Sequence, residues 1–139
     1  MTTNDEEFYQ LSKFLLDSAE QNPLITFKDC SVRTSISRAF YFIYHKLITL
    51  IGTHLKIDIQ EYAKKYRQGT HITIVRVLEE NGFESMAYGY NRLRDYRTKA
   101  DYKLKSNLPN HIAETCIEMA EDIADEVDDW LEKIGHFKK

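Results

Sequence analysis

The sequence predicts an all-α protein, built as an antiparallel bundle of four to five helices. Apolar residues recur every three to four positions along most of the chain, and no segment shows the alternation of a half-buried β-strand. Only five Gly and two Pro are present, which leaves little material for the turns of an all-β protein. The 139 residues are enough for one hydrophobic core, so a single helical domain over residues 1–139 is expected.

Helical patterns cover most of the chain, and glycine and proline separate them. The predicted helices span residues 5–19, 32–51, 59–67, 71–80 and 86–104, followed by a last helix that Asn110 caps. The pattern Thr3-Asn-Asp-Glu6 fits a capping box before the first helix, and Pro23 marks the connection that follows it. Helix ends are expected at Gly52, Gly69 and Asn81-Gly82.

The first and last helices show apolar stripes that face a common core. The predicted stripe of the first helix is Phe8, Leu11 and Leu15. The last helix is strongly amphipathic, with a predicted stripe of Ile112, Cys116, Ala120, Ile123, Val127, Leu131 and Ile134. The acidic residues between these positions are expected to form a solvated helix face.

Several classes of protein are excluded by composition and motif. The longest apolar stretch, residues 39–52, is interrupted by His45 and Lys46 and is shorter than the roughly 18 residues of a membrane span, so no membrane is expected. The acidic N-terminus does not resemble a secretory signal, which predicts a cytoplasmic protein. Cys30 and Cys116 match no metal-ligand spacing and are expected as reduced thiols. With no phosphate-binding glycine loop or nucleophile motif, no cofactor and no metal are predicted.

Charge is distributed unevenly along the chain. The net charge of −3 is the balance of −4 over residues 1–27, +7 over 28–105 and −6 over 106–139. Acidic ends around a basic middle argue against indiscriminate polyanion binding, because the acidic segments also repel phosphates. The pattern is compatible with a localised anion site. A second interpretation is that opposite charges lie on neighbouring helices and pair there.

The predicted 86–104 helix places an arginine on its inward stripe. That stripe consists of Met86, Tyr90, Leu93, Arg97, Ala100 and Leu104. A guanidinium on an apolar stripe is costly unless it is paired or faces a cleft. Asp101 lies one turn after Arg97, so the two side chains can meet on one face, and Tyr102 follows directly. A second polar set shares one side of the 32–51 helix and consists of Arg38, Tyr41 and His45.

Three segments carry a family resemblance. Residues 37–45 read Ser-Arg-Ala-Phe-Tyr-Phe-Ile-Tyr-His, Thr70-His71 precedes an apolar run, and residues 93–102 read Leu-Arg-Asp-Tyr-Arg-Thr-Lys-Ala-Asp-Tyr. In this order they resemble the S-R-x-Y-Y-x-x-F-H, S-H-x-x-V and L-x-x-x-R-x-x-A-D-Y helices of HEPN domains (higher eukaryotes and prokaryotes nucleotide-binding). The last pattern belongs to one prokaryotic branch of that family. The three segments cover most of residues 30–105.

The resemblance implies a helical bundle that commonly forms a dimer. Many HEPN proteins are metal-independent RNases of toxin–antitoxin, CRISPR-associated or other phage-defence systems, with an R-x4–6-H signature in a late helix. Others lack the signature and bind RNA or nucleotides, often beside a small nucleotidyltransferase. In this chain no histidine follows Arg97 in the expected window, and the R-x6-H from Arg38 to His45 lies in an earlier helix. Nuclease activity therefore does not carry over from the motif.

The residues singled out above allow two interpretations. As a site, the ligand would bind in one cleft, lined by Arg38, Tyr41, Arg97, Asp101 and Tyr102. RNA cleavage without a metal would need acid–base groups and a cation, for which the candidate catalytic residues are Arg97, His45 and His71. As structure, both arginines would pair with Asp101 in a buried network that the tyrosines cap.

The sequence thus favours a HEPN-type RNA- or nucleotide-binding protein of a toxin–antitoxin or antiphage defence module. Whether it is also a metal-independent ribonuclease stays open. The expected partners are RNA or a nucleotide, a second copy in a homodimer, and a nucleotidyltransferase or antitoxin. The alternative is a non-enzymatic protein-interaction or oligomerisation module whose acidic last helix engages a basic protein.

Overall fold

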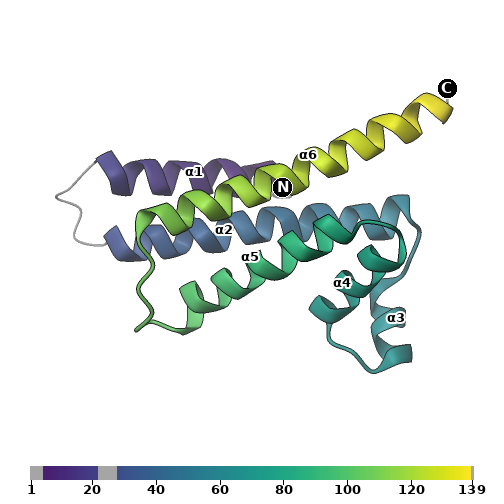
Figure 1. Ribbon diagram of the computed structural model, residues 1–139, viewed down its shortest axis with the longest axis horizontal. Coiled ribbons are helices and arrows are strands. Elements are labelled where there is room, and N and C mark those ends of the chain that lie inside the picture. The colour runs from purple at the N-terminus through teal and green to yellow at the C-terminus, as the bar shows by residue number, and fades with distance from the viewer. Residues whose placement is uncertain (1–4, 22–27, 139) are drawn as a thin grey trace.

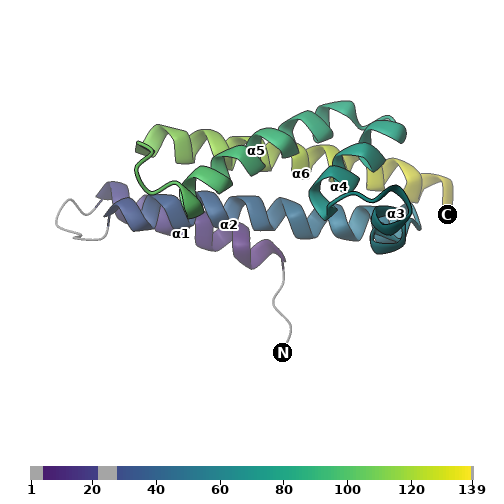
Figure 2. The same cartoon turned by 90° about the horizontal axis from the view of Figure 1, so that it is seen from below.

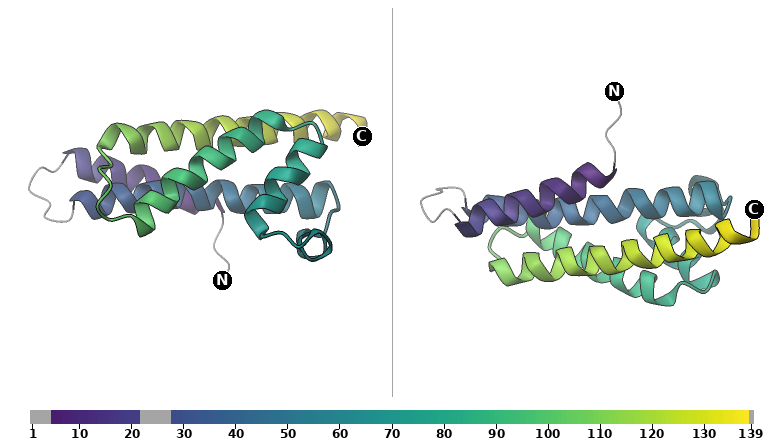
Figure 3. Two further views of the ribbon diagram at one scale, coloured as in Figure 1. Left: turned by 60° about the horizontal axis from the view of Figure 1, so that its bottom comes forward. Right: turned by 90° about the horizontal axis from the view of Figure 1, so that it is seen from above.

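The chain folds into a two-layer bundle of helices (Figure 1). The elements of this computed structural model, which describes residues 5–21 and 28–138, are α1 (Asp5–Gln21), α2 (Lys28–Thr49), the π-helical turn η1 (Leu50–His54), α3 (Ile59–Tyr66), α4 (Thr70–Glu80), α5 (Glu84–Tyr102) and α6 (Asn110–Lys138). Figure 2 shows α1 and α2 in one layer and α5 and α6 in the other. The short helices α3 and α4 pack at one end of the bundle (Figure 3). The predicted all-α class is confirmed.

Helix α2 lies at the centre because its side chains are apolar or small on most of its circumference. It packs against α1, α5 and α6, and its fully buried apolar residues are Val32, Ile36, Ala39, Phe40, Ile43 and Leu47. Helix α6 faces the core with the stripe that its periodicity predicts, of which Cys116, Ala120, Ile123 and Val127 are buried. Removing this apolar surface from water is the main stabilisation of the bundle. No helix in the described ranges is long and apolar enough to span a bilayer.

Two buried serines hold α1 close to α2. The Ser12 hydroxyl donates to the carbonyl oxygen of Ser35 at 2.6 Å, and the Ser35 hydroxyl donates to the carbonyl oxygen of Ser12 at 2.8 Å. Small side chains on both helices allow this close approach. The predicted stripe of α1 is therefore wrong at Leu11, which is 43% exposed, while Ser12 and Leu16 are buried. The capping-box residues Thr3 and Asn4, like Pro23, lie outside the described residues.

The side chain of Arg33, on α2, caps the C-terminal end of helix α5. Its Nη1 donates to the carbonyl oxygens of Lys99, Ala100 and Lys103, its Nη2 to those of Leu104 and Ser106, and its Nε to Asp29. The last carbonyls of a helix have no partner within the helix, and here one side chain supplies the donors. The helix ends at Tyr102, so the inward position predicted for Leu104 is wrong, and that side chain is 73% exposed.

The connection from α2 to α4 differs from the glycine stops that the sequence predicts. The chain continues through Gly52 as a π turn, in which the Leu55 amide donates to the Leu50 carbonyl at 3.0 Å. The left-handed residue is Lys56, with φ 57°, and Asp58 then caps α3 through its Oδ1. Gly69 does not close α3, which ends at a left-handed Arg67. Instead it is the N-cap of α4. The predicted stop at Asn81-Gly82 is confirmed, with Gly82 at φ 84°.

Candidate functional site

The polar residues predicted on α2 and α5 meet between these two helices. Arg97 donates from Nη2 to the Tyr41 hydroxyl at 2.6 Å, and its Nε lies 2.9 Å from Oδ2 of Asp101. Asp101 also accepts a hydrogen bond from the Ser37 hydroxyl at 3.3 Å. The Arg97 guanidinium stacks 5.4 Å from the Tyr102 ring centroid, although Tyr102 is 69% exposed. The structure thus brings together Arg97, Tyr41, Asp101 and Tyr102, as predicted.

Arg38 belongs to the same surface but makes no ion pair with Asp101. Its guanidinium lies 5.2 Å from the ring centroid of Tyr41 and 5.6 Å from that of Phe8. Its Nε is buried and has no hydrogen-bond partner among the described residues. The structural interpretation, in which both arginines pair with Asp101, is therefore wrong for Arg38. No carboxylate pairs with Arg38 within the described ranges, so the positive charge of its guanidinium meets only the two aromatic rings there.

His71 reaches the other end of this surface from α4. Its Nδ1 lies 2.6 Å from the hydroxyl oxygen of the buried Tyr90. Burial lowers the pKa of His71, and the positive charges of Arg94 and Arg97 lower it further. Burial raises the pKa of Tyr90, so this phenol keeps its proton. The tautomer of His71 decides the direction of the hydrogen bond: when the one ring proton of neutral His71 is on Nδ1, Nδ1 donates to the Tyr90 hydroxyl oxygen and Nε2 is a free acceptor.

His45 occupies a different environment from His71. Its ring stacks on Phe8 at 5.3 Å and meets the edge of Tyr44 at 5.2 Å. The side chain of His45 is exposed. His71 is instead half-buried and lies within electrostatic reach of Arg94 and Arg97.

Three further residues complete the site: Tyr44, Tyr90 and Arg94. The charges of Arg94 and Arg97 and the phenols of Tyr44 and Tyr41 all affect the pKa of Tyr90 electrostatically, so these groups lie near its hydroxyl. Within the described part of the chain, no carboxylate pairs with Arg94. Helical spacing could have identified Arg94 and Tyr90, because positions 90, 94, 97 and 101 share one face of α5.

We call the surface formed by Arg38, Tyr41, Arg94, Arg97 and His71 the arginine track. It extends along the antiparallel helices α2 and α5, from Arg38 beside Phe8 at one end to His71 beside Tyr44 at the other. Of its three guanidiniums, that of Arg97 pairs with a carboxylate, Asp101, while Arg38 and Arg94 form no ion pair within the described ranges. The described residues include no group of histidine, cysteine or carboxylate side chains placed to hold a metal ion.

Comparison with family models, with curated proteins and with solved structures gives no match. The likeness to HEPN domains therefore rests on the three sequence segments.

Proposed function

We propose that this chain is a HEPN-type domain that binds RNA or a nucleotide through its phosphates along the arginine track. The observation that carries the proposal is the excess of guanidinium over carboxylate, with Arg38 and Arg94 free of ion pairs in the described ranges. Guanidinium groups bind phosphate oxygens in a bidentate manner. The rings of Tyr41 and Tyr102 lie beside these cations, and Tyr44 packs edge-on against Tyr41, so aromatic rings on which bases stack adjoin the track.

The sequence motifs extend the proposal beyond binding. By resemblance, the domain acts in the cytoplasm as a homodimer within a toxin–antitoxin or antiphage defence module, with a nucleotidyltransferase or antitoxin as its protein partner. The chemistry of the track is consistent with a single-stranded ligand, because the cations follow one another along two helices. A row of cations matches the repeating phosphates of an extended strand.

A binding assay tests the proposal directly. A fluorescently labelled single-stranded RNA is titrated at several salt concentrations against the wild type and the variants Arg38→Gln and Arg94→Gln. Each substitution should weaken binding and reduce the slope of log K against log salt by about 0.7, the value for one lost phosphate contact on a single strand. Arg92→Gln is the matched control, since Arg92 is an exposed α5 arginine that acts on the buried Cys116 instead. Equal losses in all three variants would refute a localised track.

Cleavage of RNA is a separate question from binding, and it has its own test. Metal-independent RNA cleavage begins when a base removes the proton of the 2′-hydroxyl. The 2′-oxygen then attacks the phosphorus atom, the bond from phosphorus to the 5′-oxygen breaks, and the leaving 5′-oxygen takes a proton from an acid, which gives a 2′,3′-cyclic phosphate. A neutral His71 that donates from Nδ1 to Tyr90 presents Nε2 as the base, and Arg97 would stabilise the charge on the phosphorane. We expect any cleavage in EDTA to be lost in folded His71→Ala and Arg97→Ala proteins and kept in His45→Ala. Loss in His45→Ala alone would exclude this pairing.

A second candidate function is the docking of a basic protein on the acidic face. A groove of about 220 Å³ between α1 and α6 is lined by carboxylates, with Lys13 at its edge. Hydrogen bonding to Glu114 raises the pKa of Glu20, a sign that negative charge is crowded there. A lysine-rich peptide should therefore bind more tightly to the wild type than to Glu20→Gln/Glu114→Gln. Glu84→Gln, on α5, should leave peptide binding unchanged.

A further inference from the structure

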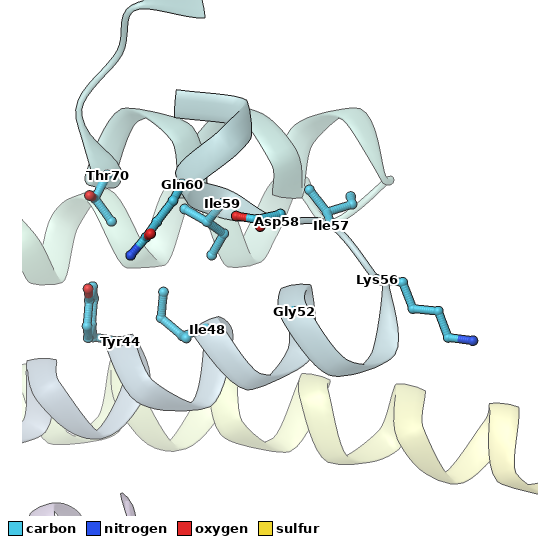
Figure 4. Close-up of a pocket in the computed structure, with 9 residues that line it drawn as sticks. All are labelled: Tyr44, Ile48, Gly52, Lys56, Ile57, Asp58, Ile59, Gln60 and Thr70. Carbon is cyan, nitrogen blue, oxygen red and sulfur yellow. The ribbon is translucent and has the colours of Figure 1, made fainter. Parts of the chain in front are cut away.

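A groove lies beside the arginine track and not on it. Its volume is about 700 Å³, within the range of sites for small organic ligands. Figure 4 shows it between the end of α2 and the start of α3, with Tyr44, Ile48 and Gly52 on one side and Ile59, Gln60 and Thr70 on the other. The π turn, the left-handed Lys56 and the Asp58 cap together hold the two walls apart.

The chemistry of the groove suits a flat, uncharged group with polar edges. Ile48, Ile57 and Ile59 give it apolar walls, while Gln60 and Thr70 offer an amide and a hydroxyl. Asp58 uses Oδ1 to cap α3, which leaves Oδ2 as an acceptor, and its negative charge disfavours a phosphate in the groove. Lys56 extends away from the cavity in Figure 4, so no ammonium offsets this charge inside.

The groove and the arginine track share a wall. Tyr44 lines the groove, and its ring centroid is 5.9 Å from that of His71 and 6.3 Å from that of Tyr41. Thr70 lies at the same end, and Figure 4 shows Tyr44 rising from α2 toward it. His71 belongs to the arginine track and directly follows Thr70, which lines the groove, so the two surfaces adjoin at this point. A ligand in the groove therefore lies close to His71, on which the charges of Arg94 and Arg97 act.

We propose that the groove holds the base of the nucleotide whose phosphate lies at Arg94 and Arg97, stacked against Tyr44. The assignment rests on the proposed function and adds to it a subsite for the base. The negative charge of Asp58 keeps the phosphate out of the groove that holds the base, because the carboxylate repels the phosphate toward the guanidiniums. Gln60 and Thr70 then hydrogen-bond the edge of the base.

Gly52 gives a substitution that fills the groove without disturbing its surroundings. A Cβ at Gly52 would meet no atom within 4 Å, so the side chain of Gly52→Leu can occupy the groove. Gly135→Leu is the matched control, because Gly135 also has open space around its Cβ and lies far along α6. Gln60→Ala removes one polar contact from an exposed position and should leave the fold intact.

The experiment compares two labelled probes, an RNA decamer and a decamer of the same sugar phosphates without bases. In the wild type and in Gly135→Leu, the RNA should bind at least tenfold more tightly than the abasic probe, since each stacked base contributes about tenfold. In Gly52→Leu this ratio should fall about tenfold while the abasic probe binds as before, and Gln60→Ala should lower the ratio partly.

The outcomes separate this assignment from the proposed function. Equal affinity of the wild type for the two probes, or an unchanged ratio in Gly52→Leu, overturns the base subsite and leaves the phosphate track standing. Failure of the wild type to bind either probe overturns the proposed function, and the subsite with it.

Discussion

At the scale of single residues, arginine has different roles in this fold, and its partners decide which. A guanidinium carries five N–H donors in a rigid planar fork. Arg33 directs donors from all three of its nitrogens to backbone carbonyls and to Asp29, and it is 7% exposed. Arg38 contacts rings and leaves its Nε without a hydrogen bond in the described ranges. Arg33 is therefore a structural residue, while Arg38 makes no ion pair among the described residues.

The role of Arg33 predicts that lysine cannot replace it. Arg33→Lys keeps the charge, but a single ammonium cannot reach the carbonyl oxygens on both sides of the α5 terminus. Buried acceptors left without donors should lower the free energy of unfolding by about 2–4 kcal/mol, measured by urea denaturation. The control is Arg76→Lys, which affects an exposed pair with Glu80 and should cost less than about 0.5 kcal/mol. Similar losses in both variants would contradict the capping role.

His71 predicts a dependence of stability on pH. Its pKa is lowered in the folded state, so below pH about 6.5 the unfolded chain binds a proton that the folded chain does not. The contribution of His71 to stability is therefore complete above this pH and is lost as the pH falls, by at most about 1.4 kcal/mol per pH unit. The difference in unfolding free energy between the wild type and His71→Gln should shrink from pH 7.5 to pH 5. A difference independent of pH would show that His71 titrates normally.

Residue-scale prediction from sequence succeeded where partners are close along the chain. Arg97 and Asp101 are one helix turn apart, and this spacing alone predicts their ion pair. The carbonyl partners of Arg33 lie 66 to 73 positions away, so no local pattern indicates them. The contact of His71 with Tyr90 likewise depends on the packing of α4 against α5.

At the scale of elements, close contact between α5 and α6 depends on a glycine. A Cβ added at Gly89 would lie 3.0 Å from Cδ1 of Ile123, a contact that requires the isoleucine to move. Alanine is favoured over glycine within a helix by about 1 kcal/mol, so Gly89→Ala brings a gain and a clash together. In the wild type the two effects should nearly cancel.

Removing the clashing atom should reveal the gain. Ile123→Val deletes Cδ1, so Gly89→Ala should stabilise the Ile123→Val protein by up to about 1 kcal/mol. The comparison is a double-mutant cycle followed by thermal unfolding. If Gly89→Ala has the same effect in both backgrounds, the packing of α5 on α6 does not require glycine at this position.

Element boundaries were predicted best where the local sequence decides them. Gly82 takes a positive φ and ends α4 as predicted, because only the adjacent turn matters there. Gly52 did not end α2, since the buried Leu50 and Ile51 keep the chain wound into the core through the π turn. Lys56 takes the left-handed conformation instead, and the resulting offset between the end of α2 and the start of α3 creates the groove. Sequence periodicity alone does not contain this tertiary effect.

At the scale of the whole molecule, the uneven charge along the chain becomes separate surfaces. The basic middle supplies the arginine track on α2, α4 and α5, while the acidic ends meet in the groove between α1 and α6. Some opposite charges do pair between helices, as Lys46 and Asp128 do at 2.9 Å. The interpretation that opposite charges pair between neighbouring helices is therefore confirmed for this pair.

The two surfaces predict an electrostatic effect at a distance. Glu114 and Glu118 line the acidic groove, so their negative charge should oppose the approach of RNA to the track without touching it. Glu114→Gln/Glu118→Gln should raise RNA affinity about two- to fivefold at 20 mM salt, where the Debye length exceeds about 20 Å. At 300 mM salt the same variant should match the wild type, because screening then acts over a few ångströms. A gain that persists at high salt would mean that RNA contacts α6 directly, and the track would then cover only part of the interface.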